Sequence, residues 1–352
     1  MAVSVIDLFC GVGGITHGFI LEGFNVVAGV DIDISCKYPY EANNTGAVFY
    51  AMDLIEEPIE NVERLFPKDD VRVLVGCAPC QPFSSNARAK RRNDDKWKLV
   101  PRFADIIEQI QPTIVSMENV TDLKNFNKGQ ILADFIRLLK YNKYHVWSDE
   151  IYCPDYGIPQ TRKRLVLLAS KLSEISMIDP TCSPDHYPTV ESTIRDLPPL
   201  EAGETDESDP VHRARGLAPI NLRRIQQSLP GGTWLDWDEE LRADCHRKSS
   251  GSTYVNVYGR MIWEQPAPTI TTQAHSYGSG RFGHPEQDRA LSLREMALLQ
   301  TFPPDYIFAL PSETVTLDHT AVLIGNAVPV NLGKAIAESI KVHLEAHGYM
   351  VD

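Results

Sequence analysis

The start of the chain carries an apolar run, a glycine-rich turn and a second apolar run, an order that restricts the possible folds. The runs are Val3 to Phe9 and Val26 to Val30, and the turn Cys10-Gly11-Val12-Gly13-Gly14 opens a helical stretch to about Glu22. This is the pattern of a βαβ unit, and such units build parallel sheets covered by helices. We therefore predict an α/β fold with a mostly parallel sheet.

Asp31 follows the second run directly. In nucleotide-binding folds an acid at this place hydrogen-bonds ribose hydroxyls. A dinucleotide fingerprint needs a third glycine, but Gly11 and Gly13 are followed by Thr16. The turn therefore suits another adenosine-bearing cofactor better than NAD, and an NAD-dependent oxidoreductase is disfavoured. A tight turn without a ligand is the alternative interpretation.

A second feature is a thiol placed just after a buried strand. The run Val73 to Val75 ends at Gly76, and Pro79 and Pro82 bracket Cys80. Ligands of open α/β sheets bind beyond the carboxyl ends of the strands, where such a thiol is held and able to react. A buried or metal-binding cysteine is the alternative. Cys77 and Cys80 form only half of a zinc site, so we predict no metal.

Two further sites carry ionisable side chains near predicted strands. Glu118 and Asn119 follow the strand Thr113 to Met117, where a carboxyl group can act as an acid or base; a helix-capping pair is the alternative. Arg162 and Arg164 lead into the strand Leu165 to Ala169 and, being two apart, face the same side of an extended chain. They can clamp an anionic or carbonyl-rich ligand, or form an ordinary surface pair.

The length of the chain and a change in its composition predict two domains. The chain has 352 residues, and from about 178 to 210 it becomes rich in Pro, Ser, Thr and acids. Ser292 to Phe302 begins with a capping box, and an amphipathic helix from about Asn331 to Ala346 ends the chain. We predict one domain formed by residues 1–175 plus 320–352, and a smaller, irregular one with a hinge formed by residues 176–319.

Charge and cysteine content narrow the class of protein. The net charge is −13, yet basic residues gather between positions 87 and 98 and between 211 and 224; such runs are usually solvated faces. Seven scattered cysteines indicate a reducing compartment. The chain shows no basic leader and no run of ~18 apolar residues, so we expect a cytoplasmic protein without a membrane span.

Taken in order, these motifs resemble the cytosine-C5 DNA methyltransferase family, in its bacterial, restriction-modification-like form. They are Asp7-Leu8-Phe9-Cys10-Gly11-Val12-Gly13-Gly14, Pro79-Cys80-Gln81, Glu118-Asn119-Val120, Gln160-x-Arg162-x-Arg164 and Gly325-Asn326. The resemblance covers nearly the whole chain. It implies a Rossmann-like S-adenosylmethionine-dependent methyltransferase fold, a mostly parallel sheet flanked by helices, with a smaller irregular target-recognition domain.

The resemblance also implies a set of catalytic roles. Cys80 would add to C6 of cytosine, so that C5 becomes nucleophilic. Glu118 would act at ring N3 and the exocyclic amine, and Asn119 would orient the loop. Arg162 and Arg164 would hold the cytosine O2 and a nearby phosphate, with Gln160 in support.

The implied cofactor is S-adenosyl-L-methionine, with S-adenosyl-L-homocysteine as product. Its predicted contacts, all carried over from the family's motifs, are Asp7, Phe9, Cys10, Gly11, Val12, Gly13, Gly14, Asp31, Ile32, Asp53, Leu54, Pro79, Leu99, Asn326, Ala327 and Val328. Ile32 replaces an aromatic residue of many members, and Ala327 replaces a serine of some.

The implied substrate is double-stranded DNA with the target cytosine flipped out of the stack. Predicted DNA contacts are Gln81, Ser84, Ser85, Arg88, Lys90, Arg91 and Arg92, and candidates in the recognition domain are His212, Arg213, Arg215, Arg223, Arg224, Arg247 and Lys248. We expect a monomer in a bacterial or archaeal cytosol, and a separately acting restriction endonuclease is a further possible partner.

Two alternatives stay open on the sequence. One branch of the family methylates transfer RNA with the same catalytic motifs, although its characteristic Cys-Phe-Thr is absent from the variable region here. The other alternative is a catalytically silent module that binds DNA. The presence of Cys80, Glu118 and the two arginines together argues against it, because binding alone does not need them all.

Overall fold

The fold is described here from a computed structural model, which covers residues 2–79, 98–248, 251 and 253–351. By its internal contacts the chain divides into two units. Unit 1 comprises Met1–Tyr152, Lys163–Pro180 and Val328–Asp352, and unit 2 comprises Cys153–Arg162 and Thr181–Ala327.

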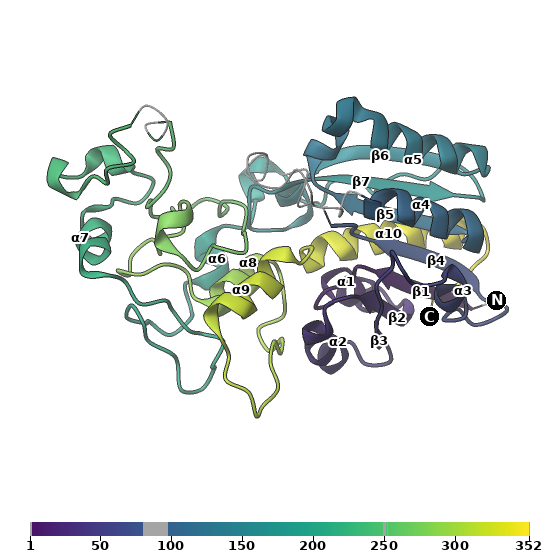
Figure 1. Cartoon of the computed structure of the whole chain (residues 1–352), viewed down its shortest axis with the longest axis horizontal. Helices are drawn as coiled ribbons and strands as arrows, with labels where there is room; N and C mark the ends of the chain where they lie inside the picture. Colours follow the sequence, from purple (N-terminus) through teal and green to yellow (C-terminus); the bar gives the residue numbers. More distant parts are fainter. Residues whose placement is uncertain (1, 80–97, 249–250, 252, 352) are drawn as a thin grey trace. The chain divides into compact units, whose positions relative to one another are not determined.

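Unit 1 is built on a seven-stranded sheet, with the strand order β3-β2-β1-β4-β5-β7-β6 over the described residues (Figure 1). The strands are β1 (Val3–Leu8), β2 (Asn25–Asp31), β3 (Val48–Ala51), β4 (Val71–Gly76), β5 (Ile114–Asn119), β6 (His145–Tyr152) and β7 (Lys163–Ser170). The pairings among β1 to β5 are parallel, and β7 is antiparallel to both of its neighbours. The predicted mostly parallel α/β sheet is thus confirmed.

Helices connect these strands. They are α1 (Gly14–Leu21), α2 (Lys37–Asn43), α3 (Ile59–Glu63), α4 (Leu99–Ile110), α5 (Gln130–Tyr141) and α10 (Val330–Ala346), with short 3-10 turns at Ile34–Cys36, Thr121–Lys124 and Phe126–Gly129. Ile6 and Leu8 of β1 join one hydrophobic cluster with side chains of α3, α4 and α5, including Phe103 and Phe135. This cluster is the core of one face of the sheet.

The other face of the sheet lies against α1 and α10. Asp7 alternates with Ile6 and Leu8 along β1, and its carboxylate accepts a hydrogen bond from Thr16 of α1. Ser170 of β7 is hydrogen-bonded to His343 of α10. The two helices touch so closely that a Cβ added at Gly18 would lie 2.4 Å from the backbone nitrogen of Lys334. Glycine at this position therefore lets α1 and α10 cover the face together.

Several boundaries differ from those predicted. Strand β5 extends to Asn119, so Glu118 and Asn119 are its last two residues rather than residues that follow it. Strand β3 ends at Ala51, before Asp53. Strand β6 was missed because its outward residues are largely polar, as suits a strand at the edge of the sheet.

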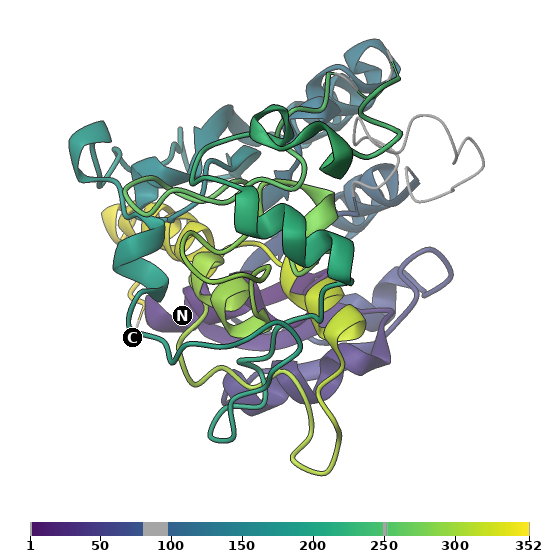
Figure 2. The ribbon, with the colours of Figure 1, turned by 90° about the vertical axis from the view of Figure 1, so that its left-hand side faces the viewer.

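Unit 2 has short helices and long connections (Figure 2). Its helices are α6 (Val190–Ile194), α7 (Pro219–Gln227), α8 (Leu293–Leu299) and α9 (Leu317–Asn326), with 3-10 turns at Cys153–Tyr156, Pro184–His186, Trp234–Asp236, Glu239–Leu241 and Tyr277–Ser279. The predicted capping box is confirmed, since Ser292 and Glu295 exchange hydrogen bonds at the start of α8.

One described stretch, Leu317–Ala346, is long and apolar enough for comparison with a membrane span. It is made of two helices, α9 and α10, and 72% of its most apolar window is buried. Buried core helices pass the same test of length and composition.

Candidate active site

The parallel strands of unit 1 end together along one edge of the sheet, the edge formed by the carboxyl ends of these strands. Leu8 pairs with Val30 on one side and with Gly76 on the other, and Gly76 in turn pairs with Met117. The residues that follow β1, β2 and β4, and the last residues of β5, are therefore neighbours along this edge. Most of the sequence-predicted site residues of unit 1 lie here.

The glycine-rich turn after β1 is held by a carboxylate from β2. The backbone N–H of Gly11 donates to Asp31 Oδ2 at 2.9 Å, and the backbone N–H of Asp33 donates to Asp31 Oδ1 at 2.9 Å. Burial raises the pKa of Asp31 above its ordinary value. Phe9 adopts a φ of 60°, which is rare for a bulky residue, and Gly11 a φ of 52°. A Cβ added at Gly11 would meet nothing within 4 Å, so the turn has open space beside it.

The other two glycines are needed for packing. A Cβ at Gly13, where φ is 91°, would lie 2.5 Å from the Asn44 side chain. A Cβ at Gly14 would lie 2.1 Å from the carbonyl oxygen of Val328. The glycines of the motif thus have different roles. Gly11 borders open space, whereas Gly13 and Gly14 permit close contacts with the end of α2 and with the segment that precedes α10.

Asp7 lies beneath this turn and is 1% exposed. Burial raises the pKa of its carboxyl group to about 7. Oδ2 accepts a hydrogen bond from Thr16 at 2.8 Å, whereas Oδ1 has no hydrogen-bond partner among the described residues. A buried carboxylate oxygen without a donor is costly, so this atom fits a site that a positively charged or N–H-bearing ligand completes.

The remaining predicted cofactor contacts differ in how far their side chains are exposed. Ile32 is 67% exposed beyond β2, and Asp53 is exposed while Leu54 is buried. Leu99 is the first residue of α4 and packs against the core, and Val12, Cys10 and Val328 are buried. Burial raises the pKa of the Cys10 thiol, so this cysteine is a packed side chain rather than a reactive one. Asn326 and Ala327 end α9 in unit 2.

Glu118 is the most constrained acid at the edge. It is 2% exposed, and its Oε1 lies 2.9 Å from Nε of Arg164. Its Oε2 accepts a hydrogen bond from the thiol of Cys77, with Sγ at 2.7 Å. The predicted pair Glu118 and Arg164 is therefore brought together by β5 and β7, and Cys77 joins it from the end of β4.

Asn119 ties two strand ends together. Its side-chain N–H donates to the carbonyl oxygen of Ala78 at 3.0 Å, and its Oδ1 accepts from the backbone N–H of Val120 at 2.9 Å. Ala78 precedes half-buried Pro79 and the segment with Cys80. Cys80 itself, and the predicted DNA contacts Gln81, Ser84, Ser85, Arg88, Lys90, Arg91 and Arg92, lie outside the described residues.

Gln160 and Arg162 belong to unit 2, unlike Arg164. Gln160 is buried and donates to Leu299 O and Gln300 Oε1, at 2.8 and 2.7 Å. Arg162 is 3% exposed, and its guanidinium donates to Ile270 O at 3.3 Å and to Ala327 O at 3.5 Å. Arg162 therefore braces the backbone of unit 2 through these two carbonyl oxygens, and the clamp formed with Arg164 stays a prediction.

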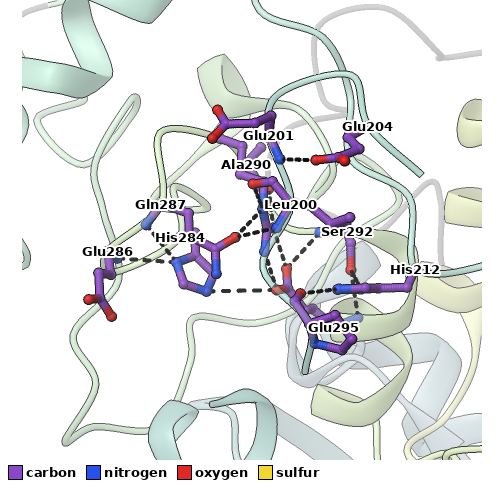
Figure 3. Close-up of polar contacts among 12 residues, drawn as sticks. Leu200, Glu201, Glu204, His212, His284, Glu286, Gln287, Ala290, Ser292 and Glu295 are labelled. Carbon is purple, nitrogen blue, oxygen red and sulfur yellow. Dashed lines mark hydrogen bonds and ion pairs between the residues drawn. The ribbon is translucent and has the colours of Figure 1, made fainter. Parts of the chain in front are cut away.

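His212 is also placed differently from the prediction. It is 1% exposed, and its ring nitrogens are bonded to Ser292 Oγ and Pro198 O, so it is no surface contact for DNA. Figure 3 shows it beside a buried network centred on Glu295. Burial alone would raise the pKa of Glu295, but the ion pair with Arg289 at 2.7 Å lowers it to about 2. Burial lowers the pKa of neighbouring His284 to about 4.

Three contacts of these sites were not found from the sequence. Cys77 was considered only as half of a metal motif, although its place directly after a buried strand, like that of Cys80, was a usable signal. Thr16, the partner of Asp7, was read only as the residue that breaks a dinucleotide fingerprint. Gln300, which accepts from Gln160, gave no signal, because its contacts come from segments far apart in the sequence.

Comparisons with known proteins show the family of this chain. The family model described as C-5 cytosine-specific DNA methylase matches residues 3–342. The chain is 53% identical to the type II methylase M.HgiDII of Herpetosiphon aurantiacus, over 98% of this chain and 97% of the relative. It is 31% identical to the type II methyltransferase M1.HphI of Haemophilus parahaemolyticus, over 97% of this chain and 87% of the relative.

Structures at lower identity share the fold. A prophage-encoded DNA modification methyltransferase of E. coli has a TM-score of 0.75 at 22% identity, covering 98% of this chain and 100% of that one. The Entamoeba histolytica methyltransferase EhMeth has a TM-score of 0.67 at 16% identity, covering 98% and 99%. The expected methyltransferase fold is thereby confirmed.

Proposed function

Because this chain belongs to the C-5 cytosine-specific DNA methylase family, we propose that it transfers a methyl group from S-adenosyl-L-methionine to C5 of a flipped-out cytosine in a specific duplex sequence. As a DNA (cytosine-5-)-methyltransferase it would serve a restriction-modification system, as the names of its type II relatives suggest. One observation carries the chemical part of the proposal: Glu118 is buried at the end of β5 and fixed by Arg164 at 2.9 Å.

The edge of the sheet fits the proposed cofactor. Asp31 would bind the ribose hydroxyls, since an acid at the end of a second strand has the right position and free lone pairs. Asp7 Oδ1 would accept a hydrogen bond from the amino group of the methionine part, which would satisfy a buried oxygen without a partner among the described residues. Gly11 has open space on its side-chain face for close approach. The cofactor supplies an electrophilic methyl group.

The catalytic residues act on the cytosine ring. The Cys80 thiolate would form a bond to C6, and Glu118 would place a proton at N3, so that the electron pair of the C5–C6 bond is available at C5. Arg164 would hold the Glu118 carboxyl and the cytosine O2. After methylation, loss of the C5 proton to water restores the double bond as the Cys80–C6 bond breaks and the thiolate leaves, and N3 returns its proton to Glu118. The target must first leave the base stack.

Unit 2 is the proposed target-recognition domain. Arg223, Arg247 and Lys248 are the better candidates for DNA contacts there, because they are exposed, whereas Arg213, Arg215 and Arg224 are only partly exposed. Arg223 pairs with Glu240, and Arg247 donates to Glu239 O, so both would have to exchange these partners for phosphates. We further propose a monomer that acts in the cytosol, where its duplex substrate is present. A separate restriction endonuclease would cleave the same sequence when it is unmethylated.

DNA is favoured over transfer RNA as the substrate. The matching family model names DNA, and the two relatives reported above are type II enzymes. A silent binding module is disfavoured, because it has no need for a buried carboxyl group held between a thiol and a guanidinium at a strand end.

The proposal is tested by tritium transfer from labelled S-adenosylmethionine. The wild type and Cys80→Ala would each be given unmethylated duplex DNA of mixed sequence or total transfer RNA. We expect label in DNA only, and none with Cys80→Ala; sequencing of the product then gives the site. Label in transfer RNA alone would support the RNA alternative. Cofactor binding without transfer to either substrate would support the silent module.

A further inference from the structure

We propose that Cys77 is a positioning residue for Glu118: its thiol fixes the second carboxyl oxygen in the orientation that the cytosine ring requires. This inference rests on the proposed function, because it assigns Cys77 a task only if Glu118 acts on cytosine. It adds a residue that lies outside the motifs by which the family was recognised, since only Cys80 of the Cys77-x-x-Cys80 pattern was given a role.

The strand register places the two side chains together. Gly76 pairs with Met117 in the parallel pairing of β4 with β5, so the next residue on each strand, Cys77 and Glu118, are neighbours. The backbone N–H of Cys77 still donates to Leu8 O, at 3.3 Å, so the base of its side chain is anchored to the sheet. Only rotation about one side-chain bond is left to place the sulfur, and it lies 2.7 Å from Glu118 Oε2.

The two oxygens of Glu118 therefore have different neighbours. Nε of Arg164 lies 2.9 Å from Oε1, as an ion pair without a hydrogen bond to that oxygen among the described residues, and the Cys77 thiol donates to Oε2. The thiol thus supplies the hydrogen bond that restricts the plane of the carboxyl group before a substrate binds. Cytosine offers an acceptor at N3 and a donor at its amine on one edge, and only a carboxyl group in the plane of the ring can meet both. Fixing the plane in advance removes a reorganisation cost from the reaction.

A thiol is a suitable group for this position because it is a weak donor. The S–H group orients the oxygen, and its hydrogen bond is broken with little loss of free energy when the cytosine binds. A side chain without a donor at position 77 would leave Oε2 without its hydrogen bond from the end of β4.

The proposal predicts a specific pattern for substitutions at Cys77. Once the methylated sequence is known, single-turnover rates and dissociation constants would be measured on a duplex that carries it. We expect Cys77→Ala to lower the methyl-transfer rate by about tenfold, the effect of one hydrogen bond to a charged group, with affinities for DNA and S-adenosylhomocysteine within about twofold. Cys77→Ser keeps a donor and should stay within about threefold of the wild-type rate.

A matched control is Cys182→Ala. Cys182 is also partly exposed, but it belongs to unit 2, and its backbone N–H donates to Asp155 O. Its thiol has no place in the proposed machinery, so its removal should leave rate and affinities unchanged.

The decisive test is a double-mutant cycle with Glu118→Gln, measured at excess enzyme over long times. If Cys77 acts through Glu118, adding Cys77→Ala to Glu118→Gln should lower the rate no further. A full additional tenfold loss in that background, or equal rates for wild type and Cys77→Ala, would overturn the proposal. Failure of the proposed function looks different: the wild type would not methylate DNA, or Glu118→Gln alone would retain the wild-type rate.

Discussion

At the scale of single residues, the partners of a buried carboxyl group separate its chemistry from that of another. Asp7, Glu118 and Glu295 are all at most 2% exposed, but their surroundings differ. Glu118 lies between a guanidinium and a thiol, and Glu295 is paired with Arg289. Asp7 has only hydroxyl and backbone partners, so burial dominates and the pKa of its carboxyl group rises to about 7.

This raised pKa has a consequence for stability. The folded protein keeps Asp7 protonated up to about pH 7, whereas the unfolded chain ionises it near pH 3.8. The stabilising contribution of the protonated form is thus complete below about pH 4 and is lost as the pH rises to about 7, a change of roughly 4 kcal/mol. Asp7→Asn lacks this titration, so the wild type should lose unfolding free energy relative to the variant across this window.

The check is urea unfolding of both proteins, followed by circular dichroism at several pH values in the absence of cofactor. A constant difference in unfolding free energy between pH 4 and pH 8 would show that Asp7 does not titrate in this window.

The ion pair of Glu295 with Arg289 leads to a second prediction. Glu295→Gln leaves the buried guanidinium of Arg289 without its counter-charge, which should cost about 3–5 kcal/mol of unfolding free energy. Glu240→Gln is the control, because Glu240 is 68% exposed in its pair with Arg223 and its loss should cost about 1 kcal/mol or less. Denaturant titrations would compare the two; equal, small effects would argue against a structural role for the network.

At the scale of elements, the ends of neighbouring strands bring the candidate site together. β1 and β2 supply the glycine-rich turn and Asp31, and β4 and β5 supply Cys77, Glu118 and Asn119. The antiparallel strand β7 then adds Arg164 to this edge, beside Glu118. Asn119 makes β5 and the loop after β4 a single unit, because its side chain binds Ala78 O at 3.0 Å.

Loss of this link should slow the reaction and leave binding intact. Asn119→Ala removes the donor to Ala78 O, so the segment leading to Cys80 is no longer tied to the end of β5. We expect the single-turnover rate to fall by about tenfold, with the dissociation constant of S-adenosylhomocysteine within about twofold. Asn142→Ala is the control, since Asn142 bonds Leu138 O and the side chain of Gln111 at the end of α5, and none of these groups belongs to the candidate site. A lower cofactor affinity with an unchanged rate would refute the role.

Sequence patterns predicted the elements well where packing is local. The apolar runs of β1, β2 and β4 and the capping box of α8 follow from periodicity and capping rules, and all are present. Glu118 and Arg164 were also predicted, but their ion pair depends on the antiparallel pairing of β5 with β7, which no local pattern encodes. Arg162 is close to Arg164 in sequence and belongs to the other unit, because contacts with Ile270 and Ala327 decide its place.

At the scale of the whole molecule, the net charge of −13 conflicts with DNA as the substrate unless positive charge is concentrated locally. The densest basic stretch includes Arg88, Lys90, Arg91 and Arg92, directly after the proposed nucleophile in the sequence. Most arginines of unit 2 are engaged by carbonyl or carboxylate oxygens. The stretch after Cys80 is therefore the main proposed source of phosphate contacts.

Neutralising two of these charges should change the salt dependence of DNA binding. If Arg91 and Arg92 each contact a phosphate, the variant carrying Arg91→Gln and Arg92→Gln should reduce the slope of log K against log salt by about 1.8. Arg137→Gln is the control, because Arg137 is exposed on α5 and paired with Asp134. An unchanged slope in the double variant would refute the phosphate contacts.

The central claim is covalent catalysis by Cys80, and 5-fluorocytosine tests it most directly. Fluorine at C5 cannot leave as a cation, so the enzyme should remain bonded to C6 after methyl transfer. Duplex DNA carrying 5-fluorocytosine at the mapped site would be incubated with enzyme and S-adenosylmethionine, denatured, digested and examined by mass spectrometry. We expect a denaturation-resistant adduct on the peptide that contains Cys80, absent in Cys80→Ala. Methylation of ordinary DNA without any such adduct, or an adduct on Cys77 instead, would contradict the account.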